Sequence, residues 1–69
     1  PNPASNLLYI DSEHLIEKSI ISDISGKQLL HFDLNAENTS LPISSLPPGT
    51  YFLTAFSSEH TITKRFVKF

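Results

Sequence analysis

The segment Leu46–Phe56, LPPGTYFLTAF, limits what this chain can fold into more than any other stretch. Pro47 and Pro48 hold φ at about −65° and lack a backbone N–H, so a strand ladder has to stop there. We expect Gly49 to complete a compact turn by adopting a backbone conformation that a Cβ would resist. Thr50–Phe56 then contains only β-branched, aromatic or apolar residues and no breaker. Because both faces of this strand are apolar, we expect it to be covered on both sides at the centre of the core.

Short strands are predicted on both sides of this segment. They cover Leu7–Ile10, Ser19–Ile24, Lys27–Leu34, Leu41–Ile43 and Thr61–Phe69. Residues 13–18 are either a further strand or irregular, and the polar residues 11–13, 35–39 and 57–60 are predicted as turns or loops. Asp23–Gly26 has a polar acceptor first and glycine last, which is typical of a β-turn. Two hairpins and about seven short strands predict an all-β fold, a small antiparallel β-sandwich.

The length and charge of the chain restrict its class. With 69 residues it is a single domain, residues 1–69, whose folding free energy we expect to be only a few kcal/mol. It has no cysteine, which excludes disulfides and cysteine-ligated zinc. A net charge of −2 argues against nucleic-acid binding, which needs a basic face. Because the chain opens at Pro1 and contains no methionine, we expect it to be a domain excised from a longer protein.

No set of residues indicates catalysis, a metal or a cofactor. His14, His31 and His60 include no pair at a metal-ligand spacing. His31 and Asp33 lie on one strand face, but no G-x-S-x-G elbow marks a serine as their nucleophile. The isolated glycines form no phosphate-binding loop, and the acidic residues form no calcium loop. We therefore predict that the chain is not an enzyme and binds no cofactor.

The last predicted strand carries three cations, Lys64, Arg65 and Lys68, which are interleaved with the apolar Ile62, Phe66 and Val67. Such a strand can dock an anionic partner or pair with another strand at an exposed sheet edge. The same charges can instead protect the edge from aggregation. The two roles do not exclude each other, and both stay open, as does self-association through this edge.

Four motifs occur along the chain in a fixed order. The first is Pro1-Asn2-Pro3, followed by Leu8 and Ile10. The others are Ile21–Lys27 with Asp23 and Gly26, then Leu41–Leu53 with Leu46, Gly49 and Tyr51, and finally Thr63–Lys68. In this order and spacing the chain resembles type A C-terminal sorting domains, which address cargo to the type IX (Por) secretion system of Bacteroidota. Ser22 stands where that family usually has an aromatic residue.

This resemblance implies a seven-stranded immunoglobulin-like sandwich at the C-terminus of a larger secreted protein. The family acts as a secretion signal, read by the outer-membrane translocon and its shuttle protein once the cargo has reached the periplasm of a Gram-negative bacterium. A cell-surface sortase then cuts before Pro1, and the cargo is released or joined to lipopolysaccharide. The resemblance marks as recognition or motif residues Pro1, Asn2, Pro3, Asp23, Gly26, Lys27, Leu46, Gly49, Tyr51, Lys64, Arg65, Phe66, Val67 and Lys68.

Two other functions stay open. One is a non-catalytic immunoglobulin-like or fibronectin-like module that binds carbohydrate or a protein partner for a secreted enzyme. Such modules use exposed aromatic platforms, and Tyr9 and Phe32 are the only candidates in a chain without tryptophan. The other is a structural spacer between domains, which predicts further sequence after Phe69.

Overall fold

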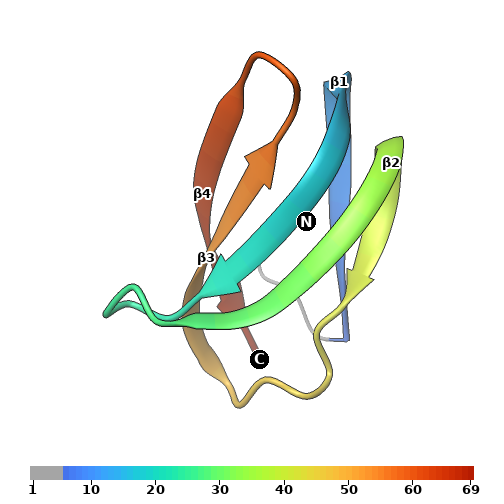
Figure 1. Ribbon diagram of the computed structural model, residues 1–69. Coiled ribbons are helices and arrows are strands. Elements are labelled where there is room, and N and C mark those ends of the chain that lie inside the picture. Colours follow the sequence, from blue (N-terminus) through green and yellow to red (C-terminus); the bar gives the residue numbers. More distant parts are fainter. Residues whose placement is uncertain (1–5) are drawn as a thin grey trace.

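The computed structural model describes residues 6–69, which form four antiparallel strands in one sheet (Figure 1). The strands are β1 (Leu7–Ser22), β2 (Gln28–Pro42), β3 (Gly49–Phe56) and β4 (Thr61–Lys68). Their order in the sheet is β2-β1-β3-β4. Across the described residues, no helix is long and apolar enough to cross a membrane.

The β1–β2 hairpin is bent back on itself. A straight strand of the length of β1 would span about 53 Å, yet the longest dimension of the molecule is 30 Å. The register shows where the bend lies, because Asp11 pairs with Asn38 and Ile16 with Ala36. Residues 12–15 of β1 therefore face residue 37 alone, and a bulge of this kind bends both strands. Figure 1 shows β1 and β2 turning together at the same end of the molecule.

The bend brings the first half of β1 over the rest of the sheet, and the core forms between them. Leu8 and Leu41 pair with each other in the first half, and they pack with Ile21 from the second half. Tyr51 and Phe66 come from β3 and β4, with ring centroids 5.7 Å apart. Ile43 and Leu46 from the β2–β3 connection complete the cluster. We call this densely filled region the closed end.

The predicted seven-stranded sandwich is not confirmed, since the described residues make four strands in a single sheet. The segments predicted as separate strands before and after residues 11–13 are one strand, and so are those before and after residues 35–39. The physical reason is that these two polar segments lie opposite each other at the bend. They stay exposed or half-buried there while the ladder continues on both sides.

The predicted hairpin turn at Asp23–Gly26 is confirmed. The Gly26 N–H donates to the Asp23 carbonyl at 3.0 Å, and the Asp23 N–H donates to the Lys27 carbonyl at 3.0 Å. Gly26 has a φ of 91°, which side chains with a Cβ rarely adopt. On the strand that follows, the alternate residues Leu30, Phe32 and Leu34 pack against the core cluster.

The prediction for Gly49 was wrong. Gly26 is the glycine with positive φ in the described chain, and a Cβ on Gly49 would make only ordinary contact with the Tyr51 ring, at 3.7 Å or more. The hydrogen-bonded turn lies earlier, where the Leu46 N–H donates to the Ile43 carbonyl at 3.0 Å. The two prolines do separate β2 from β3, and Gly49 is simply the first residue of β3.

Strand β3 was also predicted to be covered on both faces, and it is covered on one. Tyr51 and Ala55 are buried on the core face. The alternate residues Phe52, Thr54 and Phe56 are half-buried, because no described strand lies over that face.

Candidate recognition edge and cleft

Strand β4 is the outer strand of the sheet, as predicted. It pairs with β3 over its whole length, from Thr61 opposite Phe56 to Lys68 opposite Gly49. The sheet has no described strand beyond it. An outer strand of this kind can take up a further strand by backbone hydrogen bonding.

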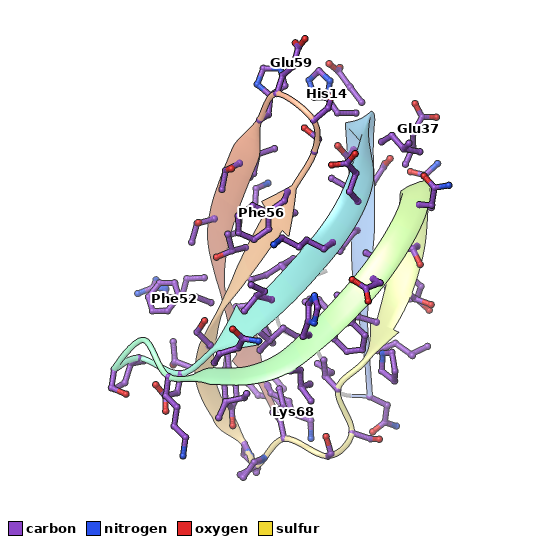
Figure 2. All side chains as sticks on the ribbon, viewed as in Figure 1. His14, Glu37, Phe52, Phe56, Glu59 and Lys68 are labelled. Atoms are coloured by element: carbon purple, nitrogen blue, oxygen red, sulfur yellow. The ribbon has the colours of Figure 1, made fainter. Side chains whose placement is uncertain are left out.

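The three cations of β4 differ in exposure. Lys64 and Arg65 are exposed. Lys68 is only 8% exposed and lies at the closed end (Figure 2). It sits opposite Gly49, which has no side chain, so the lysine stem can cover the core there. Phe66, on the same face of β4, is 2% exposed and belongs to the core.

A second strand edge is open at the start of β1. Residues Leu7–Asp11 pair with residues 38–42 of β2 on one side. Strand β1 joins β3 only further along, through Lys18–Ser22. Among the described residues, no strand therefore lies on the other side of Leu7–Asp11.

A cleft of about 350 Å³ lies between this edge and β4. The buried residues Ile16 and Ala55 contribute to its lining together with Leu53. Its two walls carry Tyr9, Ile10 and Asp11 from β1, and Ile62 and Lys64 from β4. We call this space, between Leu7–Asp11 and Thr61–Lys64, the strand slot.

A pair of histidines bounds the slot at the end opposite the core, which we call the open end. The His14 and His60 ring centroids are 4.3 Å apart, with an angle of 33° between the planes. His14 lies in the bulge of β1, where its backbone N–H donates to Ser12 Oγ at 3.0 Å. His60 lies in the β3–β4 turn, where its backbone N–H donates to Ser57 Oγ at 3.1 Å. Figure 2 shows His14 and Glu59, the residue before His60, at the same end of the molecule.

Sequence reasoning missed the histidine pair, because 45 residues separate the two and no local pattern links them. Within residues 6–69, no three histidine, cysteine or acidic side chains gather as a metal site. His31 does lie beside Asp33, with 3.3 Å between Nε2 and Oδ1, but the His31 side chain is about half exposed and that of Asp33 is largely in solvent. The pair is therefore an exposed surface ion pair when His31 is protonated.

The motif residues that precede β4 have structural roles. Asp23 Oδ1 accepts hydrogen bonds from the Ser25 hydroxyl at 2.6 Å, the Ser25 N–H at 2.9 Å and the Lys27 N–H at 3.0 Å. The Ser25 hydroxyl first, and then these N–H groups and the Lys27 charge, hold the pKa of Asp23 below its ordinary value. Asp23, Gly26 and Lys27 thus build the tip of the β1–β2 hairpin.

Leu46 and Tyr51 belong to the closed end, where the Tyr51 hydroxyl donates to the Pro47 carbonyl. This hydrogen bond ties β3 to the connection that precedes it. Pro1, Asn2 and Pro3 lie outside the described residues.

The two aromatic residues considered as a carbohydrate platform do not share a surface. Phe32 packs against the core cluster, whereas Tyr9 is 58% exposed. The flat aromatic face that this alternative requires is therefore not formed by these two side chains.

Comparison with protein families places this chain beside a known family of secretion domains. The family described as the secretion system C-terminal sorting domain matches residues 1–68. This confirms the resemblance drawn from the four motifs. Comparisons with curated proteins and with solved structures give no match.

Proposed function

We propose a function for this chain from the premise that it belongs to the family of secretion system C-terminal sorting domains. It is a folded sorting signal, here called the label, which directs the attached cargo protein through the type IX outer-membrane translocon. The family match over residues 1–68 is the observation that carries the proposal. The label is read after the cargo reaches the periplasm, by the translocon and its shuttle protein. A cell-surface sortase then removes it by cutting before Pro1, and the cargo is released or anchored at the cell surface. The label itself carries out no reaction.

Strand β4 is the surface through which we propose that the label is read. Phe66 and Lys68 are buried at the closed end and fix β4 in place, while Lys64 and Arg65 are exposed further along the strand. A strand that is already ordered can be bound without the entropy cost of folding it first. Backbone hydrogen bonds would supply affinity, and the exposed side chains would supply specificity.

Under this proposal, most motif residues act by shaping the label rather than by touching the machinery. Asp23 and Gly26 form the hairpin tip, and Leu46 and Tyr51 fill or brace the closed end. Among the described motif residues, Lys64 and Arg65 are the exposed cations on β4. We assign direct contact with the secretion machinery to these two side chains.

An export assay tests the proposal. A neutral reporter that carries an inner-membrane export signal is fused to Pro1–Phe69 and expressed in a bacterium with an active type IX system. The reporter is then measured in the medium, at the cell surface and in the periplasm. We expect the fusion to leave the cell and the reporter alone to stay in the periplasm. Retention of a folded fusion would overturn the sorting function.

The role of β4 needs a variant that keeps the core intact, because deleting the last residues would also remove the buried Phe66. Lys64→Glu reverses one exposed charge on β4, and Lys18→Glu makes the same change on an exposed residue of β1. We expect Lys64→Glu to reduce export at least about fivefold, because its new negative charge would repel an anionic partner of β4. Lys18→Glu should leave export unchanged. Equal export by two folded variants would remove β4 from the proposal and leave the sorting function standing.

A further inference from the structure

We propose that the strand slot binds an extended peptide strand with apolar side chains at alternate positions and a basic side chain near Asp11 and Glu13. This inference rests on the proposed function, because it specifies the chemistry of the partner that would bind beside β4. It adds a second wall, the edge Leu7–Asp11, to the β4 strand already proposed.

The backbone of both walls supports a peptide strand as the occupant. Leu7–Asp11 makes its ladder with β2, and no described residue pairs with its opposite side. Thr61–Lys64 is likewise paired with β3 on one side in the described chain. Backbone donors and acceptors along a free edge are satisfied by another extended backbone. Two such edges facing one cleft are a geometry that suits one inserted strand.

The side chains of the slot support apolar residues on the inserted strand. Ile62 is 41% exposed on one wall, and Ile10 is half-buried on the other. Between them the lining includes Leu53 and the buried Ile16 and Ala55. Because residues of a strand alternate between its two faces, every second side chain of an inserted strand would lie against this surface. Burying apolar area there would supply affinity in proportion to the area removed from water.

The charges of the slot support a basic residue on the occupant. Asp11 and Glu13 line it from β1 and its bulge, against the single Lys64 from β4. The His14–His60 pair lies at this same end, and His14 follows Glu13 in the chain, so a basic side chain placed there would lie near two carboxylates. We expect these charges to set register and choice of partner more than affinity, because exposed ion pairs are weak.

A tethered strand tests the slot without any secretion machinery. The full chain is extended after Phe69 by a flexible Gly/Ser linker and a strand of about eight residues, with valine and threonine alternating and one lysine. A matched version carries glutamate in place of the lysine, and a control version carries two prolines that prevent strand pairing. Thermal unfolding and amide hydrogen exchange are then measured for the three proteins.

We expect the lysine strand to raise the Tm and to slow exchange at least about tenfold at amides of Leu7–Asp11 or Thr61–Lys64, because tethering gives the strand a high effective concentration. The glutamate strand should protect less, and the proline control should not protect. Equal behaviour of the lysine and proline versions, or protection confined to other strands, would overturn the proposal.

Two further results separate the alternatives. The double variant Asp11→Lys, Glu13→Lys should reverse the preference to the glutamate strand, and an unchanged preference would overturn the charge assignment. Protection of the slot that appears in the untethered chain as its concentration rises would mean that a second copy fills it, and would overturn a foreign peptide as occupant. Because the assay needs no export, a failed export experiment with a filled slot would refute the sorting function alone.

Discussion

The two ends of this molecule are built from the same strands but filled very differently. At the closed end, Leu8, Leu41, Ile43 and Phe66 are nearly or fully removed from solvent. At the open end, Tyr9 and Ile62 remain about half exposed on the walls of a cleft. Strand β4 takes part in both ends of the molecule, with Phe66 in the core and Ile62 at the slot. The difference indicates that stability is concentrated at one end, while the other end keeps apolar surface and strand edges available for a partner.

The comparison predicts a large contrast between two substitutions on β4. Phe66→Ala should lower the free energy of unfolding by about 3–5 kcal/mol, because it leaves a cavity beside Tyr51. In a domain of this size such a loss removes most of the stability. Ile62→Ala should cost about 1 kcal/mol or less, since its side chain is 41% exposed. Urea unfolding followed by circular dichroism measures both, and similar losses would break the comparison.

A second contrast concerns the two glycines. Gly26→Ala should cost about 1–2 kcal/mol, because a residue with a Cβ is strained at a φ of 91°. Gly49→Ala at the closed end should change stability by no more than about 0.5 kcal/mol, since its Cβ would meet the Tyr51 ring at ordinary distance. Thermal unfolding of the two variants checks this. A larger cost at Gly49 would show that the closed end depends on a backbone feature as well as on side-chain packing.

Two hydroxyl groups should respond in opposite ways, and the first belongs to the closed end. Tyr51→Phe removes the donor to the Pro47 carbonyl and should cost about 1 kcal/mol, with the ring packing retained. Urea unfolding gives the value. A neutral result would mean that packing alone holds the β2–β3 connection.

The second hydroxyl lies next to the open end, where Ser19 pairs with Ala55, a residue of the slot lining. Ser19 is fully buried, and its Oγ has no hydrogen-bond partner among the described residues. Ser19→Ala should therefore raise the free energy of unfolding by about 0.5–1 kcal/mol, because it removes an unsatisfied polar group. Destabilisation measured under the same conditions would show that this hydroxyl is hydrogen-bonded in solution.

The smallest effect should come from the hairpin tip, which belongs to neither end. The pKa of Asp23 is lower in the folded state, chiefly through the Ser25 hydroxyl. Its carboxylate thus adds stability above the ordinary aspartate pKa, and this contribution is lost as the pH falls through the lowered value. Asp23→Asn should be less stable than the parent at neutral pH, and the gap should narrow by about pH 3. A gap that is constant with pH would show that the carboxylate charge contributes nothing.

Several features of the fold were predictable because the signal is local. The turn at Asp23–Gly26 follows from residue types at four consecutive positions. The outer position of β4 was predicted from its cations between apolar residues. The family was predicted from four motifs in series, and the family match confirms it.

What failed depends on pairing between distant residues. The polar residues 35–39 have the composition of a loop, but they continue β2 because the bulge in β1 lies opposite them. The burial of Lys68 does not follow from its charge, because it depends on Gly49 across the ladder, which leaves room for the lysine stem. The strand slot requires both the bend in β1 and β2 and the order of strands in the sheet, and neither can be predicted from a short stretch of sequence.

The order of the four strands has a consequence for how the label is made. Since β4 is the last of them to leave the ribosome, Phe66 joins the core only after β1, β2 and β3 have been synthesised. A chain interrupted before Phe66 has every earlier motif but cannot complete the closed end. Translation must therefore pass Phe66 before the closed end, and with it the folded domain, is complete.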